Sequence, residues 1–249
     1  MLVRPARAYG LQLYTVRDAM RGDVERTLGR VAQLGYTEVE FAGYFGRTAA
    51  QITAALATAG LRAPSAHIDL ESIRGRWPAT LEDAGSAGHE FLVLPWIQPE
   101  LRSAEGYARL ADELNQAGTV ARDAGIRLAY HNQEYDFASV GDGTGLHELM
   151  ARTDRKCVSL QLDVFWALRG GRDPGALLER YADRIRMLHL KGMAADGSMA
   201  DVGAGVVDYP GILRRAAGTV EHLFVEHDEP ADAFASARAS LEYLRTIEE

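Results

Sequence analysis

Short apolar segments recur along the chain and alternate with longer segments whose apolar residues recur at the spacing of a helix. Capping residues and glycines mark several boundaries, such as Asp23 at the start of the first predicted helix and Gly35 after its end. The predicted strands are residues 9–15, 37–41, 61–67, 90–94, 127–130, 158–163, 185–190 and 220–227. The predicted helices are residues 23–34, 48–59, 77–87, 106–123, 146–152, 174–181, 209–217 and 231–247.

This alternation of strands and helices predicts the fold class. Strands that are separated by helices pair in parallel, and eight such units close a (β/α)8 barrel of about 250 residues. We therefore expect an α/β protein, a (β/α)8 TIM barrel that forms a single domain over residues 1–249. A doubly wound open sheet is the alternative, but no G-x-G-x-x-G motif follows the first predicted strand.

Side chains on a barrel strand alternate between the interior and the helix layer, so a residue two positions before an inward residue also faces inward. Several predicted strands end in a polar residue, which we place on the inward side at the barrel mouth. The predicted inward pairs are Glu38 and Glu40, Ser65 and His67, Ala129 and His131, Gln161 and Asp163, Met187 and His189, and Phe224 and Glu226. The intervening residues are mostly apolar, for example Leu160 and Leu162, and are expected to pack beneath the helices.

Composition and charge narrow the functional classes. The net charge of −8 and the pI near 5.4 argue against a nucleic-acid partner, because phosphate binding needs a basic surface. Cys157 is the only cysteine, so neither an internal disulfide nor a thiolate metal site is expected. No long apolar run and no signal-like N-terminal segment occurs, so we expect a cytoplasmic protein without a membrane partner. A homo-oligomer is compatible with the sequence.

The last four predicted strands each carry, at or next to the carboxyl end, a side chain that can bind a cation: His131, Asp163, His189 and Glu226. Any one of these residues alone is more typical of a turn, a helix cap or a hydrogen-bonded core position. Together, two carboxylates and two imidazoles suit Mn²⁺ or Zn²⁺, and carboxylates grouped without a cation would repel one another. We predict that the four residues hold one divalent ion at about 2.0–2.3 Å.

Further polar and aromatic residues are expected on the same rim. Lys191 follows His189 by two positions and can steady a developing enolate or a substrate oxygen, although a solvated surface lysine fits the sequence equally well. Trp96 and Trp166 can form walls that stack on a sugar face, with core packing as the alternative. Glu134 is either a second acid–base group or an ordinary loop carboxylate.

Several motifs resemble one known family over nearly the whole chain. They are LQLYTVRD at 11–18, GYTEVEFAG at 35–43, SAHIDL at 65–70, YHNQEYDF at 130–137, LDVFWALRGGRDP at 162–174, LHLKG at 188–192, VGAGVVDY at 202–209 and VEHDEP at 225–230. In combination they are similar to the sugar phosphate isomerase/epimerase family, which has the xylose isomerase-like TIM barrel. That family includes isomerases, epimerases, dehydratases and proposed lyases, so the resemblance implies a fold and a metal site rather than one reaction.

The resemblance implies metal ligands at the tips of the fifth to eighth strands. Asp163, His189 and Glu226 match three of those positions directly. The ligand on the fifth strand is a glutamate in many members, and His131 occupies its place here, as in the branch with a motif like YHNHDFEF. The resemblance also implies substrate contacts at the mouth, which we assign to Gln12, Glu40, His67, Trp96 and Trp166.

Three departures from the family pattern bear on the mechanism. Gln133 replaces the second histidine of the motif, Asp136 stands where a glutamate is usual, and Gly192 stands where an aspartate often follows the lysine. The resemblance to epimerases of the family implies a mechanism with two glutamate bases. This chain has only one of them in place, Glu226. Glu134 or Asp136 can supply the second group only if its loop folds over the site.

We therefore predict a divalent-metal-dependent sugar isomerase or epimerase that abstracts a proton next to the carbonyl of a sugar or keto-sugar. The predicted catalytic residues are Glu226, Lys191 and Glu134. A metal-dependent lyase or dehydratase that eliminates from a keto-sugar or keto-glycoside is the alternative, because it needs only one base beside the metal and a proton donor.

Two alternatives belong to other functional classes. One is a phosphodiesterase like endonuclease IV, but this chain has Trp96 and Trp166 near positions where that branch has additional histidines, and it is acidic. The other is a sugar-binding barrel that keeps the metal and the aromatic walls but lacks a competent base. Deuterium exchange into candidate sugars would separate the binding protein from the enzyme.

Overall fold

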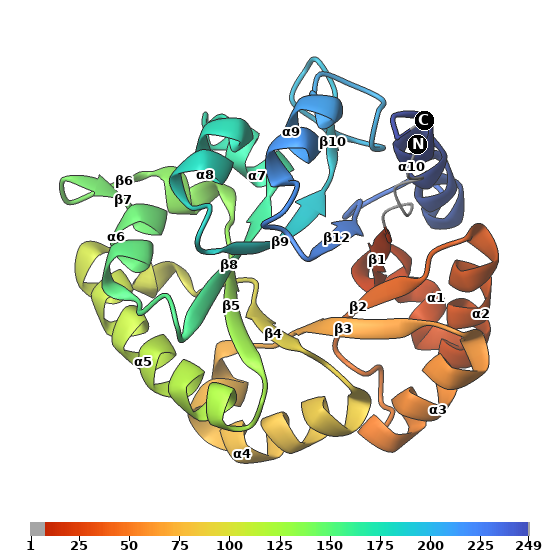
Figure 1. The fold of residues 1–249 in the computed structure, drawn as a ribbon, viewed down its shortest axis with the longest axis horizontal. Helices are drawn as coiled ribbons and strands as arrows, with labels where there is room; N and C mark the ends of the chain where they lie inside the picture. The colour runs from red at the N-terminus through yellow and green to blue at the C-terminus, as the bar shows by residue number, and fades with distance from the viewer. Residues whose placement is uncertain (1–7, 249) are drawn as a thin grey trace.

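The computed structural model describes residues 8–248, which form a closed barrel of eight parallel strands (Figure 1). The strands follow one another around the barrel in the order β1-β12-β9-β8-β5-β4-β3-β2. They are β1 (Gly10–Gln12), β2 (Glu38–Ala42), β3 (Arg62–His67), β4 (Phe91–Leu94), β5 (Arg127–His131), β8 (Val158–Asp163), β9 (Ile185–Leu190) and β12 (His222–Val225). The predicted (β/α)8 barrel is therefore confirmed.

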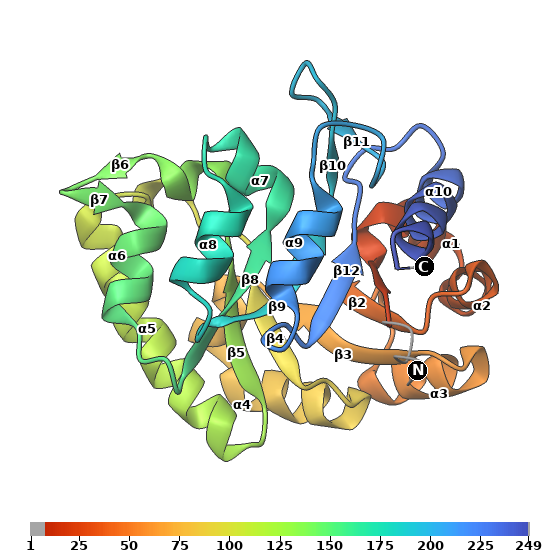
Figure 2. The same ribbon diagram turned by 45° about the horizontal axis from the view of Figure 1, so that its top comes forward.

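Helices surround the strands on the outside, and α10 closes the ring beside α2 (Figures 1 and 2). The main helices are α2 (Val24–Leu34), α3 (Ala49–Ala59), α4 (Leu70–Ala87), α5 (Ala104–Asp123), α6 (Gly145–Arg152), α8 (Pro174–Arg180), α9 (Tyr209–Ala216) and α10 (Ala233–Thr246). Shorter ones are α1 (Arg17–Gly22), α7 (Val164–Arg169) and the 3-10 helices η1 (Leu13–Val16), η2 (Pro99–Leu101) and η3 (Glu134–Phe137). Between residues 8 and 248, no helix has both the length and the apolarity needed to cross a membrane.

Local capping explains why several helices begin and end where the sequence predicts. Asp23 accepts a hydrogen bond from the amide of Arg26 at 2.9 Å and thereby caps α2. Gly35 follows that helix with a φ of 101°, a conformation that glycine adopts without steric cost. Thr48 and Gln51 form a reciprocal capping box at the start of α3.

Two elements differ from the prediction because of local side-chain chemistry. The strand β1 ends at Gln12, since this side chain accepts a hydrogen bond from the amide of Tyr14 at 3.1 Å and turns the chain into η1. The helix α4 begins at Leu70 rather than at residue 77. It bends at Arg76, where φ is −147°, because Pro78 has no amide proton and its ring crowds the preceding turn.

The mouth of the barrel carries structure that the strand and helix pattern did not predict. The helix α7 starts directly after β8, and two hairpins form in glycine-rich loops. These hairpins are β6 (Ser139–Val140) with β7 (Gly143–Thr144), and β10 (Gly192–Met193) with β11 (Met199–Ala200). All of them follow the carboxyl ends of barrel strands, so they add walls around the mouth (Figure 2).

An apolar plug inside the barrel supports the residues at the mouth. A separate cluster of fully buried side chains consists of Phe91, Val93, Ala129, Met187 and Phe224. The inward parity predicted for the last three agrees with this position. Backbone at Gly10 lies so close to the Phe224 ring that a Cβ atom there would be 2.5 Å from a ring carbon, so only glycine fits.

We expect Phe224→Ala to destabilise the fold strongly, because it opens a cavity in this sealed interior cluster. The free energy of unfolding, measured by urea denaturation, should fall by about 3–5 kcal/mol. Val206→Ala is the control, since the Val206 side chain is 61% exposed and its truncation should change stability by less than about 0.5 kcal/mol. Equal losses of unfolding free energy in the two variants would contradict a contribution of the interior cluster to stability.

Candidate active site

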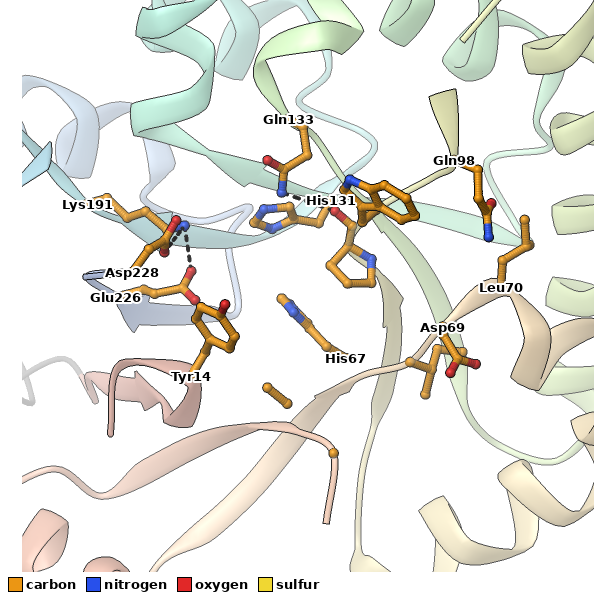
Figure 3. Close-up of a pocket in the computed structure, with 15 residues that line it drawn as sticks. Tyr14, His67, Asp69, Leu70, Gln98, His131, Gln133, Lys191, Glu226 and Asp228 are labelled. Carbon is orange, nitrogen blue, oxygen red and sulfur yellow. Dashed lines mark hydrogen bonds and ion pairs between the residues drawn. The ribbon is translucent and has the colours of Figure 1, made fainter. Parts of the chain in front are cut away.

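A cavity of about 590 Å³ opens at the carboxyl ends of the strands (Figure 3). Residues that follow seven different strands line it: Tyr14, Ala42, Gly43, His67, Ile68, Asp69, Leu70, Pro95, Trp96, Gln98, His131, Gln133, Lys191, Glu226 and Asp228. In a TIM barrel this face is where active sites lie. The size is that of a site for a whole small molecule.

The four predicted metal ligands lie together beneath and around this cavity. The Nδ1 atom of His189 is 2.7 Å from a carboxylate oxygen of Glu226 and 3.9 Å from Oδ2 of Asp163. The Nε2 atom of His131 is 3.7 Å from the same Oδ2. The sheet register explains this convergence, because Asp163 pairs with His189 and the residue before Glu226 pairs with the residue after His189.

The surroundings of His131 favour a neutral imidazole ring in which one nitrogen, Nε2, carries no proton. The side-chain amide of Gln161 donates to Glu40 at 2.7 Å, which leaves its oxygen to accept from Nδ1 of His131 at 2.9 Å. The other ring nitrogen, Nε2, is then an acceptor directed at the Asp163 side. Burial, followed by the positive charge of His189, lowers the pKa of His131 well below its usual range. A neutral imidazole is the state that binds a metal.

Asp163 divides its carboxylate between two tasks. Its Oδ1 accepts a hydrogen bond from the amide of Trp166 at 2.8 Å and caps α7. Its Oδ2 is buried and has no hydrogen-bond partner among residues 8–248. Burial raises the pKa of Asp163 above its ordinary value, although the Lys191 ammonium opposes this shift. The nearest positive group to this oxygen is the Lys191 ammonium, whose Nζ atom is 3.2 Å away, so the oxygen lies in an ionic contact rather than a hydrogen bond and a cation fits beside it.

Lys191 lies in the middle of the carboxylates rather than in solvent. Its Nζ atom is 2.8 Å from Glu226, 2.8 Å from Asp228 and 3.2 Å from Asp163 (Figure 3 shows the contacts with Glu226 and Asp228). The residue is only 2% exposed, which excludes the solvated surface position that the sequence left open. Burial lowers the pKa of this lysine, but the three carboxylates outweigh burial and raise it above its usual value.

The donor set fits one divalent cation. Asp163, His189 and Glu226 offer ligand atoms that all lie within 4.8 Å of one another, and so do His67, His131 and His189. Carboxylates outnumber the single ammonium of Lys191 in this buried region. Burial lowers the pKa of His189, but Glu40 and Glu226 together raise it to about 10, which shows how strongly the position favours positive charge.

Glu40 and Gln12, which the sequence predicts as substrate contacts, lie beneath the cavity rather than in its lining. Both side chains are fully buried and are absent from the described cavity lining. Glu40 accepts hydrogen bonds from Gln12, at 2.7 Å, and from Nε2 of His189, and it also bonds Ser65. A carboxylate that holds the far nitrogen of a metal-binding histidine orients the ring and fixes its tautomer. We therefore expect Glu40 to position His189 rather than to touch the substrate.

His67 and Trp96 line the cavity as the sequence predicts. Tyr14 and Asp228 line it as well. Trp96 is 48% exposed and Tyr14 is 41% exposed, so both present aromatic faces to solvent at the mouth. The sequence reasoning missed Tyr14 and Asp228. Their signals were available: Tyr14 shares its parity with Gln12, and Asp228 lies two positions beyond Glu226.

The predicted residues Glu134 and Trp166 lie elsewhere. Both line a second cavity beside the first, and Glu134 is 3.7 Å from the guanidinium of Arg169. Asp136 is fully buried and accepts hydrogen bonds from Tyr107 at 2.6 Å and Tyr130 at 2.8 Å. Neither loop carboxylate lines the first cavity, so the structure does not support either as a second base there.

We expect Glu40→Gln to weaken metal binding without changing a ligand. The amide nitrogen of glutamine would face the donors that now surround the carboxylate, so His189 would lose its orientation. The affinity for Mn²⁺ or Zn²⁺, measured by calorimetry, should fall roughly 10–100-fold. Glu38→Gln is the matched control from the same strand, since Glu38 contacts His222 and Arg62 at the other end of the barrel. Equal affinities for Glu40→Gln and wild type would refute the positioning role.

Asp136 should make the stability of the fold depend on pH. Burial raises its pKa from 3.8 to about 6, against hydrogen bonds from Gln133 and two tyrosines. The folded state therefore holds the proton more tightly, so this stabilisation is full below about pH 4 and is lost as the pH rises through 6. Relative to Asp136→Asn, wild type should lose on the order of 2–3 kcal/mol between about pH 4 and pH 7, measured by denaturant unfolding. A difference that stays constant with pH would contradict this.

Comparison with known proteins agrees with the geometry. The family model described as xylose isomerase-like TIM barrel matches residues 28–247. An inosose dehydratase from Geobacillus kaustophilus is 28% identical over 196 residues, which cover 69% of this chain and 63% of that protein. The match thus spans less than two thirds of the relative's own length.

Solved structures show the same fold. A sugar phosphate isomerase/epimerase from Parabacteroides distasonis superposes with a TM-score of 0.83 at 24% identity, covering 98% of this chain and 96% of that one. The IolI protein, solved with a zinc atom bound, superposes with a TM-score of 0.77 at 14% identity and covers 97% and 98% of the two chains. From the family match over most of its length, this chain belongs to the xylose isomerase-like TIM barrel family.

Proposed function

We propose that the protein is a divalent-metal-dependent enzyme that removes a proton from the carbon next to the carbonyl of a sugar or keto-sugar. The observation that carries this proposal is the convergence of buried ligand atoms of Asp163, His189 and Glu226 within 4.8 Å of one another at the barrel mouth. Family membership and a relative named inosose dehydratase support a small carbohydrate as the substrate.

Asp163, His189, Glu226 and His131 are the residues that would hold the ion. When bound, a divalent cation polarises the substrate carbonyl and makes the adjacent C–H group more acidic. Two carboxylates and two imidazoles suit Mn²⁺ or Zn²⁺, and the zinc atom bound in the IolI structure supports a cation in a barrel of this fold.

Glu226 is the proposed base. Burial raises the pKa of this carboxyl group, but Lys191 and His189 outweigh burial and hold it below its usual range, so the group is ionised and can accept a proton. Lys191 keeps its charge 2.8 Å from Glu226. Its ammonium can stabilise negative charge that develops on a substrate oxygen and can supply a proton to that oxygen.

The side-by-side arrangement of this base and acid favours elimination of water. The C–H bond breaks with its proton going to Glu226, the new C=C bond forms, and the β-hydroxyl leaves as water with a proton from Lys191. Epimerisation needs a second base on the opposite face. The carboxylate there, Asp69, is engaged in capping α4 through the amide of Ser72 at 2.7 Å.

Isomerisation is the second candidate. It also needs a single base, which returns the proton to the neighbouring carbon, and Glu226 beside Lys191 can perform both transfers. The two reactions share their first step, so one exchange experiment tests both, and the loss of water in the product distinguishes them.

We expect the Mn²⁺- or Zn²⁺-loaded protein to incorporate deuterium from heavy water into at least one member of a panel of keto-sugars and keto-inositols. Mass spectrometry reports the exchange and any loss of water. Glu226→Gln should lower the exchange rate by at least about 100-fold, because a positioned base contributes this much. Glu229→Gln is the control, an exposed carboxylate three residues later that should leave the rate unchanged.

Three outcomes would count against the proposal. Exchange that survives in Glu226→Gln would remove this residue from the mechanism. Exchange that persists after chelation of the metal would remove the ion from it. Sugar binding without exchange for any compound would favour a binding protein instead.

A further inference from the structure

A second cavity, of about 680 Å³, lies beside the first at the barrel mouth. Its lining comes from the segments that follow β4, β5 and β8. Trp96 and Gln133 line both cavities, so the two are adjacent along a common wall. Each cavity has the size of a complete small-molecule site. A free monosaccharide bound at Glu226 and Lys191 would leave the second cavity without a role.

The walls of the second cavity are aromatic and its charges are held in fixed places. Trp96, Tyr135, Phe137 and Trp166 contribute four rings. The guanidinium of Arg102 stacks 3.6 Å from the centre of the Tyr135 ring, and two of its nitrogens donate to the carbonyl of residue 97 at 2.9 and 3.2 Å. Flat aromatic faces with polar groups at their edge bind sugar rings and aryl rings.

A second arginine widens the polar edge of this cavity. Arg169 donates to the carbonyl of Gly197 at 3.1 Å and lies 3.7 Å from Glu134. Arg102 and Arg169 are far apart in the sequence, and both line the cavity. Glu134 lines the same cavity and offsets one of the two positive charges, so its edge offers donors and an acceptor for hydroxyl groups.

Trp166 lines the second cavity and lies near residues of the first. Asp163 holds its backbone amide at 2.8 Å, and the ammonium of Lys191 is 5.5 Å from the centre of its ring. The Nε1 atom of Trp166 is buried and has no hydrogen-bond partner in the described part of the chain.

We infer that the second cavity binds a second ring that is attached to the reacting sugar, so that the substrate class is two-ring glycosides rather than free monosaccharides. The sugar that reacts occupies the first cavity, and its glycosyl or aryl substituent stacks on Trp166. This inference rests on the proposed function for the location of the reacting sugar. It concerns binding, so it can be tested without turnover.

The test is calorimetric titration of the full chain with pairs of ligands. Each pair is a free hexose or pentose and its 4-nitrophenyl β-glycoside, and disaccharides such as cellobiose form a third arm. At least one glycoside should bind about tenfold or more tightly than its free sugar. The aryl and disaccharide arms show whether the second ring is aromatic or a sugar. A panel in which no glycoside is favoured overturns the inference.

Three variants locate the effect. Trp166→Ala should abolish the glycoside advantage, and Ala138→Trp should do the same by filling the second cavity from an exposed position, with no effect on free sugars. Tyr14→Ala is the matched control, because Tyr14 lines only the first cavity and should weaken a sugar and its glycoside by the same factor. If Trp166→Ala and Ala138→Trp both leave the advantage intact, the inference is wrong.

The outcome is independent of the exchange experiment. A glycoside advantage located at Trp166, without deuterium exchange, would refute the enzymatic proposal and retain the second cavity as a binding site. Exchange into free sugars without a glycoside advantage would support the enzymatic proposal and refute the proposal that the second cavity binds a second ring.

Discussion

The excess of buried carboxylate over buried positive charge is the constraint on which the barrel mouth depends. The neutral side chains of Gln12, Ser65 and Gln161 all donate hydrogen bonds to the carboxylate of Glu40. Asp163 and Glu226 are left with the Lys191 ammonium and the ring of His189. These two carboxylates thus share one ammonium and one imidazole, and the ligand atoms of Asp163, His189 and Glu226 lie close enough together to hold a divalent ion.

The barrel interior is arranged in layers that keep this charge in place. Deepest in the barrel, beneath the polar residues, lies the apolar cluster that includes Met187 and Phe224. Above it lies a layer of amide and hydroxyl groups that each donate a hydrogen bond to the carboxylate of Glu40. The histidines and carboxylates at the cavity rest on that layer. Because each layer is packed and hydrogen-bonded, the ligand atoms are held before any ion arrives.

Much of this arrangement was predictable from strand parity. Parity placed His131, Asp163, His189 and Glu226 on the inside at the carboxyl ends, because side chains of one strand alternate strictly. Parity does not give depth, which is why Glu40 was assigned to the cavity although it lies beneath it. The burial of Lys191 depends on three carboxylates from other strands, and no local pattern reports that.

Residues in loops and in very short helices could not be placed from the sequence. The helix α7 has only six residues, too few for a periodic pattern, so the position of Trp166 and Arg169 could not be inferred. Glu134 and Arg102 come from loops after different strands and reach the same cavity only through the packing of those loops. Arg102 and Arg169 likewise line one cavity from segments that follow different strands, which no local sequence pattern reports.

The divided carboxylate of Asp163 links two properties that could otherwise vary separately. One oxygen begins α7 and so fixes where Trp166 stands, while the other faces the charge cluster. A substitution that preserves the helix start, such as asparagine, would sacrifice the anionic oxygen, and glutamate would shift the helix. Relatives that adapt to substituents of other shapes are thus expected to change the residues farther along α7 and leave its first position alone.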